Sequence, residues 1–362
     1  MADKQAVKQV LLQASRATGL VAAARVATRH GFNVIGFHGV SLADEHRRFP
    51  TLFISPATFE RRLAFLARQY RIVSLEEALA QHAAGRIGPR QVVLTFDDGF
   101  YNFLGAAIPL LKKYGAPATV YTVSNDIETA DPMFNLLLRD MVLHAPGPTA
   151  TGLPHDPAAT CDLTSLPARE RVVSDVLSAF YARCLDSEAR WTYCRTAAAA
   201  LRVDMDEKIR ARYWDRLNAA EVRDVVAQGF DVQLHTHSHR NVVENREVVR
   251  EEVRRNRAVL ERLTRRTVTD FCYPLGLWDK DVWPDLRAEG VRSAVTTRNG
   301  PNYPQTPVLA LRRYLTGEAM TDLEFEVGLS GLRWLGHALQ RPGTRFEASE
   351  KRLRYKEQPQ LY

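Results

Sequence analysis

The chain contains 362 residues, of which 45% are hydrophobic and 25% are charged, and its formal net charge is +7. These proportions are those of an ordinary soluble globular protein, and the length allows one large α/β domain with additions. No apolar run approaches the ~20 residues of a membrane-spanning helix, and the N-terminus lacks the apolar core of a secretory signal. We therefore expect a cytoplasmic protein whose four cysteines are reduced. No stripe of basic and aromatic residues favours nucleic acid, so the positive charge indicates anionic lipid or an acidic glycan.

Residues 4–30 have the pattern of a helix that mixes basic and apolar side chains. The basic residues are Lys8, Arg16, Arg25 and Arg29, and the apolar ones include Val10, Leu11, Leu12, Leu20 and Val21. Two interpretations stay open, because such a helix either packs on the main domain or lies on the cytoplasmic face of a membrane. A second pattern at residues 329–339, with Leu332, Trp334 and Leu335 between Arg333 and Arg341, could add a second contact.

From residue 33 onward, short apolar runs alternate with helical patterns. The predicted strands are 33–37, 92–96, 118–123, 230–234, 269–273 and 293–297. The predicted helices are 55–69, 75–82, 103–114, 218–229 and 246–263, with one more that stops at Gly290. Polar residues at three helix starts support these assignments, namely Ser55, Ser74 with Glu77, and Asn218 with Glu221. Repeated strand-then-helix units predict a parallel sheet with right-handed crossovers, closed or nearly closed into a barrel.

The run at residues 92–96 ends in two adjacent carboxylates, Asp97 and Asp98, and a glycine. Such an apolar, β-branched run predicts a buried strand of a parallel sheet. Its C-terminal end is where α/β folds place their active sites. Two neighbouring carboxylates repel each other unless a cation or a shared proton relieves them, so the pair suits one metal ligand and one base.

Residues 126–217 break the alternation. They contain a Pro/Gly-rich loop at 145–157 and helical patterns such as 169–183, which together predict a helical insertion within the barrel. The insertion either packs on the outside of the barrel or forms a wall or lid for the substrate, and the sequence does not decide between these roles.

Three of the ten histidines lie within five residues, directly after the predicted strand 230–234. His235 and His239 are separated by four residues, which lets two imidazoles reach one cation from a helical turn or a curved loop. With Asp98 they form a facial ligand set that leaves positions open for water and substrate. We expect a structural role for His237, which lies between the two ligands.

Three segments resemble motifs of the polysaccharide deacetylases, carbohydrate esterase family 4. These segments are TFDDG at 95–99, HTHSH at 235–239 and FCYPLG at 271–276. The resemblance extends over roughly residues 33–315, apart from the insertion. It implies the distorted (β/α)7 barrel of this family, an α/β fold that here carries the helical insertion.

The resemblance also implies a role for each motif residue. Asp98, His235 and His239 would be the metal ligands, since the family uses the second acid of the pair as a ligand. Asp97 would be the base that takes a proton from the attacking water. The backbone amide of Leu275, directly after the motif proline, would donate to the developing oxyanion.

The chain departs from the family pattern in two places. Many members have an arginine two residues before the motif proline, where it orients the base, and this chain has Cys272. Many members also carry a catalytic histidine near the end of the domain, and residues 309–316 contain none. We hypothesise that Arg312 or Arg313 takes the place of the missing arginine.

An apolar strand ending in His38 accounts for the missing histidine. Residues 34–40 and 55–79 resemble a circularly rearranged branch of the family, which includes the bacterial poly-N-acetylglucosamine deacetylases and carries the final motif at the front of the domain. The resemblance implies that His38 is the general acid that protonates the leaving amine.

We therefore predict a metal-dependent hydrolase that removes N-acetyl groups from an N-acetylhexosamine in a glycan, such as an exopolysaccharide, or in a lipid-linked saccharide. Zinc is the first choice of metal for two histidines and a carboxylate, and cobalt, nickel or iron fit the same ligands. The alternatives are an inactive glycan-binding protein and a deformylase or other amide hydrolase. The predicted parts are an N-terminal amphipathic helix (1–30), the barrel (31–322) with its insertion (126–217), and a C-terminal helix and tail (323–362). The sequence does not indicate the oligomeric state.

Overall fold

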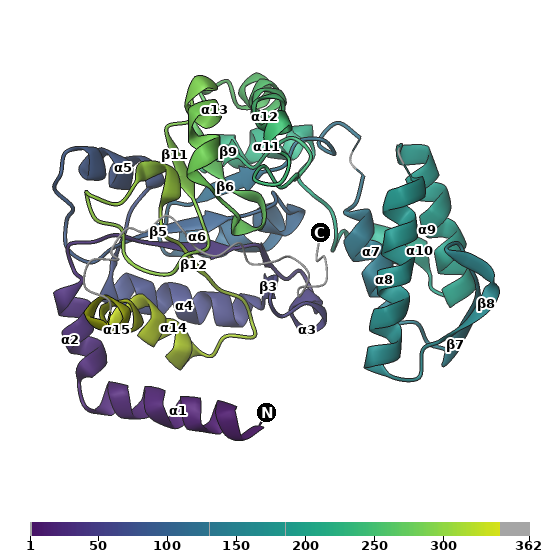
Figure 1. Cartoon of the computed structure of the whole chain (residues 1–362), viewed down its shortest axis with the longest axis horizontal. Coiled ribbons are helices and arrows are strands. Elements are labelled where there is room, and N and C mark those ends of the chain that lie inside the picture. The colour runs from purple at the N-terminus through teal and green to yellow at the C-terminus, as the bar shows by residue number, and fades with distance from the viewer. Residues whose placement is uncertain (1, 130, 185, 341–362) are drawn as a thin grey trace. The chain divides into compact units, whose positions relative to one another are not determined.

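The computed structural model describes residues 2–129, 131–184 and 186–340 (Figure 1). The described residues divide into two compact units. Unit 1 comprises 2–128 and 217–340, and unit 2 comprises the described part of 129–216. Within the described residues, no helix is both long enough and apolar enough to cross a membrane.

A parallel sheet forms the centre of unit 1, with strand order β11-β10-β9-β6-β5-β1-β12 and with β4 paired to β5. The strands are β1 (Asn33–Phe37), β4 (Arg71–Ile72), β5 (Gln91–Phe96), β6 (Thr119–Thr122), β9 (Asp231–Leu234), β10 (Asp270–Cys272), β11 (Ser293–Val295) and β12 (Tyr314–Leu315). The two edges of the sheet approach each other, because Leu311, just before β12, forms a parallel bridge with Val295 of β11. The sheet is thus curled into a distorted (β/α) barrel, and the predicted fold class is confirmed.

The central strands are buried on both faces, as a parallel sheet covered by helices requires. Every residue of β1 and of β5 is buried. Phe37 and Phe96 lie opposite each other in these strands and stack at 5.2 Å between ring centroids, while Phe59 of α4 meets Phe37 edge-on at 5.1 Å. Each such aromatic pair contributes about 0.5–1.5 kcal/mol beyond its area burial, so this cluster ties α4 to the strands that carry the site.

Side-chain caps begin the helices where the sequence predicts them. Ser55 caps α4 (Pro56–Gln69), Ser74 caps α5 (Leu75–Ala83), and Asn218 forms a full capping box with Glu221 at α11 (Ala219–Ala227). The other helices of unit 1 are α1 (Ala2–Ala17), α2 (Leu20–Ala27), α3 (Glu45–Arg48), α6 (Ile108–Lys113), α12 (Val249–Thr264), α13 (Trp283–Ala288), α14 (Asp322–Leu329) and α15 (Leu332–Gln340). A short parallel pair, β2 (Gly39–Val40) with β3 (Phe53–Ile54), completes the unit.

Three predicted helices are interrupted, each for a local reason. The pattern at 4–30 divides into α1 and α2 because Gly19 adopts a positive φ of 77°. The pattern at 329–339 spans the end of α14 and most of α15, with Gly331 at a φ of 78° between them. The predicted helix 103–114 begins as a π-helical turn before α6, because Pro109 cannot donate a backbone hydrogen bond. Arg341 and the tail beyond it lie outside the described residues.

Unit 2 is mainly helical, with α7 (Phe134–Leu143), α8 (Leu166–Arg183), α9 (Ser187–Leu201) and α10 (Met205–Ala211). The loop predicted at 145–157 is wrong for most of its length, because β7 (Thr149–Leu153) and β8 (Asp156–Asp162) form an antiparallel hairpin. The glycine that suggested a loop, Gly152, instead adopts a φ of 88° where the strand register shifts. Thr151 and Thr160 face each other across the hairpin and hydrogen-bond through their hydroxyls at 3.0 Å.

Candidate active site

The candidate site lies at the carboxyl ends of neighbouring parallel strands. Asp97 and Asp98 follow β5, and His235 follows β9, with β6 between them in the sheet. The register pairs Phe37 with Phe96, so His38 and Asp97 leave adjacent strands side by side. The Asp97 amide donates to the Phe37 carbonyl at 2.8 Å, so the hydrogen bonds between β1 and β5 extend as far as Asp97. The sheet therefore gathers residues from three widely separated parts of the chain at one edge.

The structure brings Asp98, His235 and His239 together. His235 Nε2 lies 3.2 Å from Asp98 Oδ1 and His239 Nε2 lies 3.4 Å from the same oxygen. One ligating atom from each residue falls within 4.8 Å of the other two. A single cation can contact three donors at this spacing, and two imidazoles with one carboxylate form a donor set typical of transition metals.

Hydrogen bonds fix the orientation of His235. Its Nδ1 lies 2.8 Å from the carbonyl oxygen of Cys272, so Nδ1 carries a proton and Nε2 is directed at Asp98. This arrangement is the usual one for a metal-binding histidine, in which the second nitrogen donates to a backbone carbonyl. Cys272, the last residue of β10, thus contributes to the site through its backbone carbonyl.

Two residues of α12 hold the histidine loop, and the sequence analysis did not identify them. Asn256 accepts a hydrogen bond from the His235 amide at 2.9 Å, and its Nδ2 donates to the Thr122 carbonyl at 3.0 Å. Glu252, one turn earlier, accepts from both the amide and the hydroxyl of Ser238. Both side chains are buried. In the sequence, Glu252 and Asn256 could have been recognised as two polar residues, four apart, on the apolar face of an amphipathic helix.

Several site residues adopt the left-handed backbone conformation that costs non-glycine residues energy. They are Asp98 (φ 68°), Thr236 (φ 63°), His239 (φ 57°) and Leu275 (φ 61°). Each such residue costs on the order of 1–3 kcal/mol and persists only where the surrounding structure determines it. Half of the positive-φ non-glycine residues in the described chain therefore lie in these three motif segments. Strain of this kind is typical of functional sites.

Arg313 holds the first carboxylate. Its Nη1 lies 2.5 Å from Asp97 Oδ1, its Nη2 lies 3.2 Å from Cys272 Sγ, and its Nε donates to the Thr296 carbonyl. Of the two arginines that the sequence offered for this place, Arg313 is the one in contact with Asp97. Arg312 instead lies over the Trp334 ring, 5.7 Å from its centroid. A Cβ at Gly36 would lie 2.5 Å from Leu315 and 3.2 Å from Arg313, so the glycine in β1 leaves room for both side chains.

Electrostatics keep Asp97 ionised despite its burial. Desolvation alone would raise its pKa, but Arg313, His235 and His38 together lower the pKa below its usual value. His38 also lowers the pKa of Asp98, and the pairing of β1 with β5 places His38 beside the two acids. An ionised, buried carboxylate beside a histidine is a suitable pair for general base and general acid.

The remaining predicted residues occupy distinct places. Leu275 lies in the turn Pro274–Gly276, directly after β10, with its left-handed backbone. His237 points to β6, where its Nδ1 lies 3.0 Å from Ser124 Oγ and its carbonyl accepts from the Ser124 amide. His237 thus anchors the loop and is absent from the metal-binding group.

The site also contains a second group of potential ligands, Asp97 with His235 and Cys272. Burial raises the pKa of the Cys272 thiol, and a metal ligand must be a thiolate. Asp97 is already paired with Arg313. The group around Asp98 is therefore the better metal site.

The donor set around Asp98 fits a metal ion. Within the described residues, neither carboxylate oxygen of Asp98 has a hydrogen-bond partner, although both are buried. Burial by itself raises the pKa of Asp98, yet the two histidines and His38 lower it, so the group is held as a carboxylate. A buried anion whose oxygens accept no hydrogen bond and face two imidazole nitrogens has the chemistry of a metal ligand.

Comparisons with known proteins agree with this geometry. The family model "Polysaccharide deacetylase" matches residues 84–144 and 199–294, which contain both carboxylates and the histidine loop. Poly-beta-1,6-N-acetyl-D-glucosamine N-deacetylase of Escherichia coli strain K12 is 29% identical over 102 residues, which span 28% of this chain and 15% of that protein. This chain therefore corresponds to only a small part of that relative.

Solved structures of the same fold include the Streptococcus pyogenes deacetylase PplD in complex with acetate. It aligns with a TM-score of 0.56 and 16% identity over 83% of this chain and 99% of its own. IcaB from Ammonifex degensii aligns with a TM-score of 0.51 and 17% identity over 83% of this chain and 97% of its own. At these identities the likeness to solved structures shows the fold alone. Residues 84–144 and 199–294 match a polysaccharide deacetylase domain, and unit 1 has the distorted (β/α) barrel of these structures.

Proposed function

We propose that this protein is a metal-dependent N-deacetylase that removes acetyl groups from N-acetylhexosamine residues of a glycan or lipid-linked saccharide. The proposal rests on one observation, that the two adjacent acids have different partners. Asp98 faces His235 and His239, while Asp97 contacts Arg313 and follows the strand that pairs with the one before His38. A site that only bound sugar would need neither a base nor an acid.

Asp98, His235 and His239 would hold the divalent ion, with zinc the first choice for this donor set and cobalt, nickel or iron also suited to it. The bound ion would supply Lewis acidity to the amide carbonyl and would lower the pKa of a water molecule. The amide oxygen gains negative charge as water attacks, so a backbone N–H aimed at it would stabilise the transition state. The turn at Leu275 is the proposed source of that donor.

The proton steps are assigned to two side chains. Asp97 takes a proton from the attacking water, and the contact with Arg313 keeps its carboxylate ionised for this purpose. His38 gives a proton to the departing amine nitrogen as the C–N bond breaks. The reaction then leaves acetate and a free amino sugar, and the two proton carriers return to their starting states by exchange with solvent.

The comparisons support the substrate class. The Escherichia coli relative is named for removing N-acetyl groups from a glucosamine polymer, and the PplD structure is a complex with acetate. The residues matched by the family model, 84–144 and 199–294, do not include His38 or Arg313. His38 directly follows β1, which pairs with β5, and Arg313 directly precedes β12, which pairs with β1. Their positions agree with the rearranged order of motifs that the sequence suggested.

Acetate release from short N-acetylglucosamine oligomers tests the proposal. We expect release by the purified protein, loss of release with a chelator, and recovery with zinc or cobalt. Asp97→Asn keeps the shape of the side chain and should lower turnover about 100- to 10,000-fold, the usual cost of a lost base. The matched control is Asp131→Asn, because Asp131 is another buried carboxylate, hydrogen-bonded by Ser187 and Trp191 in unit 2. Equal turnover by Asp97→Asn and the parent would refute the assignment.

A further inference from the structure

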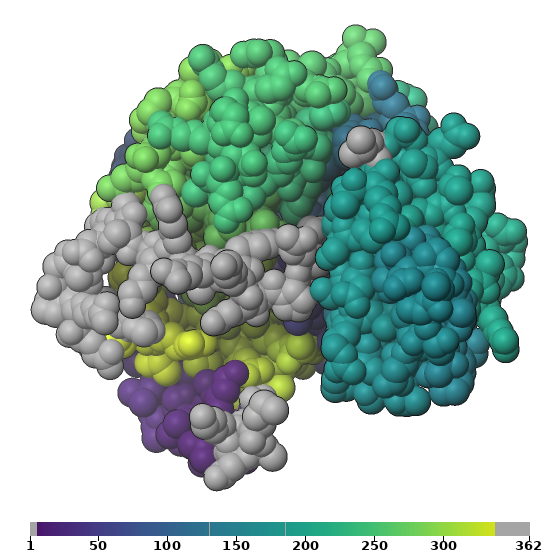
Figure 2. Space-filling view, turned by 45° about the vertical axis from the view of Figure 1, so that its right-hand side comes forward, coloured from purple at the N-terminus to yellow at the C-terminus, as the bar shows by residue number. Residues whose placement is uncertain are grey.

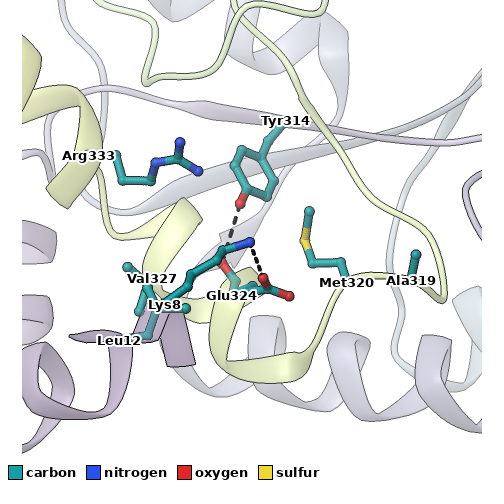
Figure 3. Close-up of a pocket in the computed structure, with 8 residues that line it drawn as sticks. All are labelled: Lys8, Leu12, Tyr314, Ala319, Met320, Glu324, Val327 and Arg333. Atoms are coloured by element: carbon teal, nitrogen blue, oxygen red, sulfur yellow. Dashed lines mark hydrogen bonds and ion pairs between the residues drawn. The ribbon is translucent and has the colours of Figure 1, made fainter. Parts of the chain in front are cut away.

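The helix α1 places its charged residues toward unit 1. Lys8 pairs with Glu324, and Arg16 pairs with Glu326 at 3.3 Å, both on α14. Figure 3 shows Lys8 and Leu12 directed at α14, where they line a pocket of about 270 Å³ together with Val327 and Tyr314. The inward face of α1 is therefore largely polar, and ion pairs hold it.

The outward face of α1 and α2 is apolar. The exposed large hydrophobic residues there are Val7, Val10, Leu11, Leu20 and Val26, each 53–64% exposed. They account for five of the seven such residues in the described part of the chain. Ala14, Ala17, Ala22 and Ala23 are exposed between them. In Figure 2 this segment, in purple, forms a ledge at one margin of unit 1.

This arrangement is the reverse of an ordinary surface helix, whose apolar stripe faces the core. The α2 helix buries only Val21 and Ala24 and leaves Leu20 and Val26 in solvent. Exposed large apolar residues gathered on neighbouring helices are typical of sites of protein or membrane contact. Lys8 and Arg16 on the other side of α1 pair with Glu324 and Glu326, so the apolar side is the one left in solvent.

Exposed basic residues flank this apolar face. Arg68 of α4 is exposed in a pocket beside α1, whereas Arg16, Arg61 and Arg62 of the same pocket pair with Glu326 and Asp322. At the end of α2, Arg29 and Arg90 are exposed and adjacent, since the Arg90 amide donates to the Arg29 carbonyl at 2.6 Å. An apolar centre with a cationic rim matches the interface of an anionic bilayer.

We propose that the outward face of α1 and α2, here called the docking face, inserts into the headgroup region of an anionic lipid bilayer. Val7, Val10, Leu11 and Leu20 would enter the interface, and the exposed Arg29, Arg68 and Arg90 would contact lipid phosphates. A second copy of the chain fits this face less well, because a two-fold contact would bring the arginine rims together. The proposal does not depend on the deacetylase activity, since it concerns a different surface of unit 1.

Co-sedimentation with vesicles tests the docking face. The full-length protein is mixed with vesicles of phosphatidylglycerol and phosphatidylcholine, or of phosphatidylcholine alone, at low and at high salt. We expect binding to the anionic vesicles at low salt and a clear decrease at high salt, because screening weakens the contacts to exposed arginines. Leu11→Asp combined with Leu20→Asp should reduce binding about tenfold or more, because it removes apolar area and adds negative charge.

Leu166→Asp is the matched control. Leu166 is 64% exposed, as Leu11 is, but it lies at the start of α8 in unit 2, so this variant should bind like the parent. Thermal unfolding and acetate release from short soluble oligomers should match the parent in all variants, which separates lost docking from lost folding or chemistry.

Three results would overturn the proposal. The first is parental binding by the Leu11→Asp, Leu20→Asp variant, and the second is no vesicle binding by the parent. The third is a dimer that light scattering detects in the parent and that this variant loses, which would assign the face to a second copy.

Discussion

Replacing Arg313 with glutamine should destabilise the protein and impair its chemistry together. The guanidinium is buried, 1% exposed, and contacts Asp97 Oδ1 at 2.5 Å, while the carboxylate is 5% exposed. Removing one partner of a buried ion pair leaves the other charge without compensation, which typically costs about 3–5 kcal/mol. For a domain of this size such a loss corresponds to a decrease in Tm on the order of 10 °C.

The direction of the pH dependence follows from the pKa of Asp97. Because its folded-state pKa is depressed, the pair stabilises the fold above the unfolded pKa of an aspartate, about 4, and the stabilisation is lost as pH falls through the folded value. The stability difference between parent and variant should therefore be large near pH 7 and small near pH 3. Without Arg313, burial raises the pKa of Asp97, so the acid limb of the kcat/KM profile should move to higher pH.

Differential scanning fluorimetry and acetate release across pH measure both effects. Arg312→Gln is the matched control, because it removes the same charge from the adjacent position without touching Asp97. Arg312 lies against Trp334, and its backbone exchanges hydrogen bonds with the Asn302 side chain, which the substitution keeps. If Arg313→Gln and Arg312→Gln have the same Tm and the same acid limb, Arg313 does not support Asp97.

The purified parent should contain about one divalent ion per chain by elemental analysis, and His235→Ala should contain almost none; because histidines bind metal only when neutral, occupancy should fall below about pH 6. His38→Ala should keep the ion and lose about 100- to 10,000-fold in turnover, and parental turnover would exclude His38 as the general acid. Asn256→Ala removes three buried hydrogen bonds around the histidine loop and should weaken metal affinity about 10- to 100-fold in a competition titration, as loss of an outer-shell partner usually does; unchanged affinity would count against this role. Glu318→Gln should lower the Tm at pH 7, since hydrogen bonds from Ser55 and Thr58 outweigh burial and lower the pKa of Glu318, and this difference should vanish as pH falls toward 3.

The site residues at the strand ends could be predicted from the sequence, because each motif directly follows the strand that carries it. The buried run of β5 precedes two acids, and the short strand β9 precedes the histidines, so each motif already showed its place in the sheet. Parallel strands bring their carboxyl ends to one edge, which made the meeting of Asp98 with His235 predictable. The cap residues Ser55, Ser74 and Asn218 were similarly visible, since each acts on its own helix.

The contacts of α12 were not predictable in the same way. Glu252 and Asn256 appeared as ordinary members of a long, charged helix, because its many arginines and glutamates dominate the pattern. Their importance depends on contacts with the histidine loop, and the apolar face of α12, which carries Val249, Val253 and Leu260, does not by itself show what lies against it. The β7–β8 hairpin was missed for a related reason, since glycine and proline signal a turn and say little about pairing on its two sides.

Arg313 shows where sequence reasoning ends and tertiary structure begins. Neighbouring residues in an extended segment point to opposite sides, so only one of Arg312 and Arg313 can face the barrel interior. The strand that follows, β12, has only two residues, which is too short for an alternating pattern to set the phase. The phase is instead set by pairing with β1, where Tyr314 lies opposite Ile35 and Leu315 opposite Gly36. This register brings the Arg313 guanidinium to Asp97. In the strand order, Arg313 and the histidine loop lie on opposite sides of β5. Arg313 thus takes the place of the motif arginine for which this chain has Cys272, and it contacts the Cys272 sulfur.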